Sequence, residues 1–310
     1  METSGEIDPS AIFSAKGLVA VVSGGGSGIG RAITASLVRT GAKVFILGRR
    51  IDVLTDTAKA LDLSSTKVVP LRCDITSDAS IAAVVQQIQA DTGYIDVLVN
   101  NAGIASPFFN INTAASVDEL SAGLLQAHLK TPDVLAANTT SVIGVTAALL
   151  PLLDKGNKRR GWRNGSKLGP ADVNSRSPSA APADVDAADD RSSQIITISS
   201  IAGIERHGFT GLAYSASKAG ALHLGKVFST MLAPWNIRSN VILPGLFPSE
   251  MTSFLPTTDV PFNEAPTGRA GRVEDVAGFV LYLVGRAGAF VNGAVLLADG
   301  GRTSQEPCAA

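Results

Sequence analysis

The stretch Leu18-Val-Ala-Val-Val-Ser-Gly-Gly-Gly-Ser-Gly-Ile-Gly30 decides the fold of this 310-residue chain. Its first five residues are apolar and rich in β-branched side chains, which is typical of a strand buried on both faces. A glycine-rich turn follows, and residues 31–40 have the period of an amphipathic helix. A strand, a tight turn and a helix N-terminus in this order direct free backbone N–H groups at one point. The stretch therefore predicts a site for a pyrophosphate.

Each glycine of the turn has its own role in this prediction. Gly24 permits the tight turn, Gly28 lets the backbone approach the ligand, and Gly30 allows close packing of helix on strand. The intervening Ser27 and Ile29 are predicted to belong to the same site. The spacing differs from the commoner G-x-G-x-x-G pattern, although the physical argument is the same. The alternative is a glycine-rich loop that binds nothing.

A second informative segment is Tyr214-Ser-Ala-Ser-Lys218. Four residues make about one helical turn, so the phenol and the ammonium are predicted to lie on the same face of a helix. A neighbouring ammonium favours the phenolate and should lower the pKa of Tyr214 from its ordinary value of about 10. Such a tyrosine can exchange a proton with a carbonyl oxygen near neutral pH. A solvated helix face is the alternative interpretation.

Together with these segments, four further motifs resemble the short-chain dehydrogenase/reductase family. The motifs are Cys73-Asp-Ile-Thr76, Asn100-Asn-Ala-Gly103, Pro244-Gly245 and Asp299-Gly-Gly301. The resemblance extends from about Ala15 to Arg302 and is broken by one insertion. Several ordered motifs in one chain are more specific than any one of them. The resemblance implies an enzyme that transfers hydride with a nicotinamide cofactor.

The resemblance also implies the catalytic roles. Tyr214 is expected to be the general acid when a ketone is reduced, and Lys218 is expected to lower its pKa and hold the nicotinamide ribose. Ser200 is expected to hydrogen-bond the substrate carbonyl. Ser199 is less suited, because neighbouring strand residues point to opposite faces. Asn138 is expected to anchor a proton-relay water, and the alternative is a hydrogen bond to its own helix.

The end of the second predicted strand distinguishes between the two nicotinamide cofactors. A carboxylate there hydrogen-bonds the ribose 2′-hydroxyl, whereas an arginine accommodates a 2′-phosphate. The chain has Gly48-Arg49-Arg50 and no acid at this place, which favours NADP(H) with Arg49 as the ligand. The alternative for one arginine is a solvated helix start. Further cofactor contacts implied by the resemblance are Asp74, Asn101, Pro244 and Gly245.

Short apolar runs alternate with helical patterns along the chain. The predicted strands are residues 18–22, 43–47, 67–71, 95–99, 194–198, 237–243 and 294–297. The predicted helices are residues 29–40, 51–62, 77–91, 132–153, 212–233 and 273–285. This alternation predicts an α/β fold with a doubly wound, parallel seven-stranded sheet of the Rossmann type. We expect a single domain over residues 15–302, with tails at 1–14 and 303–310.

Residues 154–193 interrupt this pattern. They have no apolar period, with six Lys or Arg residues between Lys155 and Lys167 and four Asp residues between Asp184 and Asp190. Such a composition cannot bury a core of its own, so we expect a disordered surface insertion whose residues 155–192 are dispensable. The alternative is that its basic half docks a partner or a nucleotide.

Overall composition narrows the possible classes of protein. A formal net charge of −1 gives no electrostatic reason to expect a nucleic-acid partner. The two cysteines do not suggest a disulfide framework, and no residues stand at metal-ligand spacing. The acidic N-terminal segment is not a secretory signal, and no run predicts a membrane span. We therefore expect a cytoplasmic protein without a metal.

Residues 244–267 are mostly apolar and are expected to cover a small lipophilic carbonyl substrate. His207, in the preceding loop, is expected at the surface. We expect reduction of a ketone or 3-oxoacyl-type carbonyl to a secondary alcohol, in similarity to 3-oxoacyl reductases. The alternatives are an alcohol dehydrogenase working in the oxidising direction and a non-catalytic binding protein on a reductase scaffold.

The helix predicted at residues 213–233 is apolar on more than one face, so it requires a partner beyond its own sheet. We expect a homo-oligomer, specifically a homotetramer, in which the last strand supplies a second contact. The alternative is a monomer in which the insertion covers the apolar face.

Overall fold

The computed structural model describes residues 8–64, 66–105, 114–162, 167–182, 185–186, 188–206, 210–248, 258–262 and 264–305. Its centre is a parallel seven-stranded sheet of order β3-β2-β1-β4-β5-β6-β7. The strands are β1 (Val19–Ser23), β2 (Lys43–Gly48), β3 (Val68–Arg72), β4 (Val97–Asn100), β5 (Gln194–Ile198), β6 (Arg238–Pro244) and β7 (Val295–Ala298). Each predicted strand is confirmed to within two residues.

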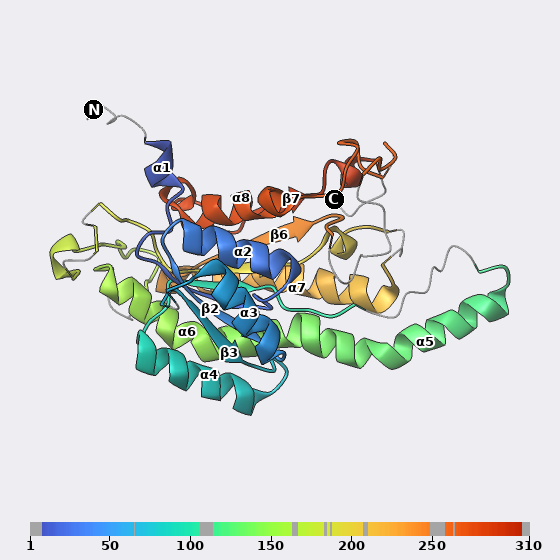
Figure 1. Ribbon diagram of the computed structural model, residues 1–310, viewed down its shortest axis with the longest axis horizontal. Coiled ribbons are helices and arrows are strands. Elements are labelled where there is room, and N and C mark those ends of the chain that lie inside the picture. Colours follow the sequence, from blue (N-terminus) through green and yellow to red (C-terminus); the bar gives the residue numbers. More distant parts are fainter. Residues whose placement is uncertain are drawn as a thin grey trace.

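Helices cover both faces of the sheet (Figure 1). One face carries α2 (Gly28–Arg39), α3 (Ile51–Leu61) and α8 (Val273–Val284), and the other carries α4 (Asp78–Asp91), α6 (Ser141–Arg159) and α7 (Leu212–Met231). In β1, Ala20 and Val22 pack with the first group, whereas Val19 and Val21 pack with the second. Both faces of the strand are therefore buried, which explains its uninterrupted apolar sequence.

Shorter elements complete the described chain. They are α1 (Pro9–Ile12), the π-helical turn η2 (Ala136–Thr140), and the 3₁₀ turns η3 (Pro178–Ala180), η4 (Ile201–Gly203), η5 (Ala233–Trp235), η6 (Arg286–Gly288) and η7 (Arg302–Ser304). The order of the strands reverses between β1 and β4. In doubly wound sheets, ligands bind beyond the carboxyl ends of the strands at such a reversal.

The helix predicted at residues 132–153 is much longer than expected. It continues a preceding helix, α5 (Val117–Leu135), through η2 into α6, and the whole stretch has 43 residues. The pattern of α5 was missed because its apolar side chains do not form a buried stripe. Leu125 and Leu129 are more than 60% exposed. In Figure 1, α5 extends beyond the body of the domain.

The stretch Val117–Arg159 is long and apolar enough to cross a membrane, and 44% of its most apolar window is buried. Length and composition are weak evidence for a membrane span, because a buried core helix passes the same test. Here α6 is such a core helix: Val145, Leu149 and Leu153 are at most 2% exposed.

The two ends of the segment 154–193 are folded into the body, so the prediction of a wholly solvated insertion is wrong. Its first residues form the last turn of α6, and Arg160 is 1% exposed, with Nη2 2.7 Å from Oδ1 of Asp96. At the other end, both carboxylate oxygens of Asp189 accept hydrogen bonds of 2.7 Å from Arg191. Two of the charges that suggested solvation, Arg160 and Asp189, are thus buried in ion pairs. Residues 167–179 are mostly exposed, as expected.

Arg191 also ties the segment to distant parts of the chain. Its guanidinium donates to the carbonyl oxygens of Ser14, Lys16 and Val284. Nearby, Arg238 at the start of β6 donates to Gly288 and Val291. The buried arginines therefore join the insertion, the N-terminal segment and α8 at the amino ends of the strands.

Asp189 should make a pH-dependent contribution to stability. Burial alone would raise its pKa, but the hydrogen bonds and charge of Arg191, with the charge of Arg160, lower the pKa from 3.8 to about 2. Because the folded-state pKa is depressed, the contribution is present above about pH 4 and is lost as the pH falls towards 2.

We predict that Asp189→Asn lowers the free energy of unfolding at pH 7 by about 3–5 kcal/mol, because it leaves the buried guanidinium of Arg191 without its carboxylate partner. Urea denaturation measures this, and the difference from the wild type should shrink between pH 4 and pH 2. Asp172→Asn is the matched control, since Asp172 lies in the same segment but is exposed. Equal stability of the two variants at pH 7 would contradict the role given to Asp189.

Candidate active site

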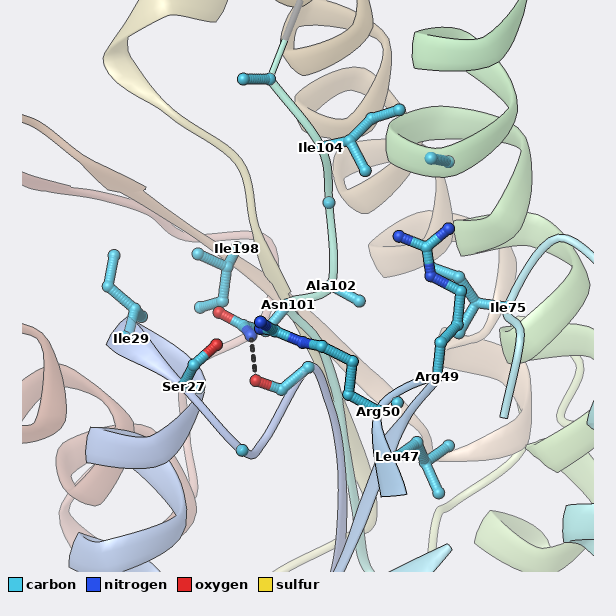
Figure 2. Close-up of a pocket in the computed structure, with 18 of the residues that line it drawn as sticks. Ser27, Ile29, Leu47, Arg49, Arg50, Ile75, Asn101, Ala102, Ile104 and Ile198 are labelled. Atoms are coloured by element: carbon cyan, nitrogen blue, oxygen red, sulfur yellow. Dashed lines mark hydrogen bonds between the residues drawn. The ribbon is translucent and has the colours of Figure 1, made fainter. Parts of the chain in front are cut away.

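A cavity of about 1050 Å³ lies at the carboxyl ends of the strands, where the strand order reverses. Figure 2 shows its wall, with Ser27 and Ile29 at the start of α2, Asn101 and Ala102 after β4, and Arg49 and Arg50 after β2. All predicted site residues except Asn138 line it: Gly24, Ser27, Gly28, Ile29, Gly30, Arg49, Asp74, Asn101, Ser200, Tyr214, Lys218, Pro244 and Gly245.

The glycine turn has the geometry that its sequence predicts. Gly24 and Gly28 have φ of 68° and 49°, in the left-handed region that favours glycine. A Cβ atom on Gly30 would lie 2.1 Å from the carbonyl oxygen of Gly24 and 2.5 Å from Nδ2 of Asn101. Gly30 thus allows α2 to pack against the turn itself. The Ser27 side chain makes no capping hydrogen bond to α2, so the cavity meets a helix N-terminus without a side-chain cap.

Asn101 holds this turn against the end of β4. Its Nδ2 donates to the carbonyl oxygens of Ser23, at 2.9 Å, and Gly24, at 3.4 Å. In return, the backbone N–H groups of Asn101 and Ala102 donate to Oγ of Ser23. The family resemblance predicted Asn101 only as a cofactor contact, and these bonds to the glycine turn were missed.

The end of β2 carries two cations and no acid. Arg49 and Arg50 both line the cavity, and in Figure 2 their side chains leave the strand in different directions. Asp74, after β3, accepts hydrogen bonds from the N–H and the hydroxyl of Thr76, at 2.9 and 2.7 Å. These bonds lower the pKa of Asp74, and the charge of Arg49 lowers it further. Asp74 is therefore a carboxylate at neutral pH.

Ser200, Tyr214 and Lys218 come together on the opposite side of the glycine turn. Ser200 follows β5, and Tyr214 and Lys218 lie in the first two turns of α7. Tyr214 and Ser200 are hydrogen-bonded through their side chains. The ammonium of Lys218 lies 5.7 Å from the centre of the Tyr214 ring and donates to the carbonyl oxygen of Ile198 at 3.1 Å.

The pKa of Tyr214 differs from the expectation. Burial raises it, and the hydrogen bond with Ser200 only opposes this effect. Burial also lowers the pKa of Lys218, to about 8. The prediction of a lowered tyrosine pKa is therefore wrong for this structure, because desolvation outweighs the other effects on the phenol. Tyr214 is a neutral phenol near pH 7 and retains a proton that it can donate.

Asn138 lies behind the cavity in η2 and is 2% exposed. Its Oδ1 accepts from the N–H of Ile104 at 2.8 Å, and its Nδ2 donates to the Ile104 carbonyl at 2.9 Å and to Oγ of Ser217 at 3.0 Å. The side chain therefore bonds to neighbouring segments and not to its own helix. A Cβ on Gly103 would lie 2.9 Å from Oδ1, so the close approach requires glycine there.

Several lining residues carry no motif and were missed. Ile104, Asp133 and Ile198 reach the wall only because the fold brings their segments together, whereas Phe247 belongs to the expected substrate cover. His207 and residues 249–257, which form part of the expected substrate cover, lie outside the described residues. Within the described chain, no group of three or more His, Cys, Asp or Glu residues could hold a metal ion.

This arrangement fits a nicotinamide dinucleotide. The N-terminus of α2 and two guanidinium groups can bind phosphates, and they line the same cavity as Tyr214 and Lys218. A ligand with an anionic part and a reacting part could therefore occupy both regions at once.

Comparisons with known proteins agree with this geometry. A short chain dehydrogenase family model matches residues 18–161, and an enoyl-(acyl carrier protein) reductase model matches residues 170–303. The chain is 38% identical to the short-chain dehydrogenase/reductase VdtF of Byssochlamys spectabilis, over 96% of each chain. It is 32% identical to the rhamnolipids biosynthesis 3-oxoacyl-[acyl-carrier-protein] reductase of Pseudomonas aeruginosa, over 93% of this chain and 97% of the relative.

A solved structure shares the fold over nearly the whole chain. The Pseudomonas aeruginosa RhlG/NADP active-site complex superposes with a TM-score of 0.71 at 29% identity, covering 94% of this chain and 98% of that one.

Proposed function

The chain belongs to the short-chain dehydrogenase/reductase family of enzymes, and from that premise we propose that it uses NADPH to reduce a ketone, of the 3-oxoacyl type, to a secondary alcohol. The observation that carries this proposal is the meeting of Ser200, Tyr214 and Lys218 in the cavity formed by the glycine turn. The same groups could catalyse the reverse oxidation. Tyr214 is a protonated phenol at neutral pH, as the acid of the reduction must be.

Tyr214 is the proposed general acid. When bound, the nicotinamide supplies the hydride for the carbonyl carbon. The phenol of Tyr214 gives its proton to the carbonyl oxygen, and the hydroxyl of Ser200 stabilises the negative charge that grows there. Lys218 lies close enough for its ammonium to stabilise the tyrosinate that remains. We further propose that Lys218 binds the nicotinamide ribose. Asn138 is proposed to anchor a water through which Tyr214 regains its proton.

The described wall near Tyr214 supports an apolar substrate. Ile104, Ile198 and Phe247 line the cavity, whereas Arg49, Arg50 and Asp74 lie at the ends of β2 and β3. The remaining charged lining residues are Asp133 and the catalytic candidate Lys218. An uncharged carbonyl would replace water against these side chains at little cost. A relative whose name specifies a 3-oxoacyl-[acyl-carrier-protein] substrate points in the same direction.

We predict that Tyr214→Phe abolishes ketone reduction while the affinity for NADPH persists, because the ring still packs but the proton donor is gone. The assay follows NADPH absorbance with a panel of ketones and 3-oxoacyl thioesters. Wild-type activity should fall above about pH 8, where Lys218 loses its charge. A wild type inactive on every carbonyl would contradict the proposed function, and an active Tyr214→Phe would contradict the role of Tyr214.

For the cofactor we propose NADP(H). Gly48 offers no carboxylate to bind the ribose 2′-hydroxyl, and Arg49 and Arg50 line the cavity at this point. The superposed relative is described as an NADP complex, which supports the same choice.

We predict that NADPH binds on the order of tenfold or more tightly than NADH, since one charge-assisted hydrogen bond is worth about 1.5–3 kcal/mol. Fluorescence titration of both cofactors measures the ratio. Arg49→Ala should remove most of the preference and leave NADH affinity nearly unchanged. Equal affinities of the wild type for the two cofactors would contradict the assignment.

We further propose a homo-oligomer, with a tetramer as the expected form. Apolar side chains are exposed on α5 and α7, and Leu129, Val227 and Met231 are at least 42% exposed. The described part of the insertion does not cover this surface. The edge strand β7 exposes Val295 and Leu297 on one face. Apolar surface of this kind commonly marks a contact between subunits.

Light scattering at micromolar concentrations tests the assembly, and a species larger than the monomer is expected. Replacing Leu125 and Leu129, both exposed on α5, with Glu should reduce the mass. A monomeric wild type over the whole concentration range would contradict the proposal.

A further inference from the structure

Two hydroxyl groups outside the proposed catalytic set bond to the backbone of the turn that carries Lys218. Ser199, directly after β5, is 3% exposed, and its Oγ donates to the carbonyl oxygen of Lys218 at 2.6 Å. On another side of α7, Oγ1 of Thr139 in η2 donates to the carbonyl oxygen of Ser217 at 2.7 Å. Two consecutive carbonyls of the helix are thus bonded from two different elements.

Further close contacts join this turn of α7 to the end of β5, to η2 and to η4. The side chain of Lys218 donates to the carbonyl of Ile198, so its backbone and its ammonium are held by adjacent residues. A Cβ on Gly220 would lie 2.8 Å from Cγ2 of Thr139, and a Cβ on Gly203 would lie 2.8 Å from the backbone of Lys218. These two glycines allow η2 and η4 to approach the helix at this turn.

These hydroxyl bonds are not needed to form a helix. Carbonyls in the interior of α7 already have N–H partners four residues later, and the hydroxyls add a second donor. A second hydrogen-bond donor on a fixed neighbouring strand sets the position of the helix relative to the sheet. Here it acts one turn after Tyr214, so it sets how far the phenol and the ammonium reach towards Ser200.

We propose that Ser199 and Thr139 are positioning residues, whose hydroxyls fix the first turns of α7 against β5 and η2 and so place Tyr214 and Lys218 beside Ser200. The inference rests on the proposed function, because it gives these bonds a role in the same reaction. Neither hydroxyl is assigned a contact with substrate or cofactor. A shift of the reacting groups by about 1 Å can reduce turnover by about a hundredfold.

A matched control is a hydroxyl bond to another carbonyl of the same helix, α7. Ser239 in β6 is fully buried, and its Oγ donates to the carbonyl oxygen of Gly225 in α7 at 2.9 Å. It makes the same strand-to-helix bond, but about two turns beyond Lys218. Ser199→Ala and Ser239→Ala therefore remove the same kind of interaction at different distances from the catalytic groups.

We expect both alanine variants to lower the melting temperature by similar amounts. Ser199→Ala should reduce kcat by on the order of tenfold or more, with little change in NADPH affinity, whereas Ser239→Ala should retain near wild-type kcat. Hydrogen–deuterium exchange supplies a readout independent of activity. Exchange should rise in the peptide covering Tyr214–Leu222 for Ser199→Ala only.

Thr139→Val and Thr139→Ser provide a second pair in case Ser199→Ala does not fold. Loss of turnover in Thr139→Val with recovery in Thr139→Ser would support the inference. It is overturned if Ser199→Ala, or Thr139→Val in its place, matches Ser239→Ala in both kcat and exchange. A wild type that reduces no carbonyl would contradict the proposed function, while the exchange comparison would still decide the positioning role.

Discussion

The hydrogen bonds that join the ends of β1 and β4 are the constraint on which the site depends. Asn101 donates to the carbonyls of Ser23 and Gly24, and Ser23 accepts from the backbone after β4. These strands adjoin where the sheet reverses its order, which is the place where doubly wound sheets bind ligands. The bonds hold the glycine turn open towards the cavity, with Gly30 close enough that a side chain there would collide with the turn.

The opposite ends of the strands serve stability. There Asp96, Arg160, Asp189, Arg191 and Arg238 are all at most 7% exposed and join segments that are far apart in sequence. Pairing of buried charges is costly to disrupt, because each group left alone has no water to replace its partner. This buried network thus lies at the end of the strands opposite the candidate active site. The insertion belongs to the stabilising end and not to the active site.

Burial determines the electrostatics of the catalytic groups. It raises the pKa of Tyr214 above its ordinary value and lowers that of Lys218 to about 8, so the two values lie further apart than in water. The hydroxyl bonds to the backbone of α7 suit this arrangement, because desolvated groups gain most from being held at fixed distances.

The sequence by itself determined the positions of the strands along the chain, the glycine turn and many of the residues that meet in the cavity. Each of these follows from a local pattern: an apolar run for a strand buried on both faces, and a positive φ that requires glycine. Tertiary structure alone decided the pKa of Tyr214, the pairing of Asp189 with Arg191 and the partners of Asn138 and Ser199. The physical reason is that burial and hydrogen bonding depend on which distant segments come into contact. A charged segment has the same composition whether its charges face water or face each other.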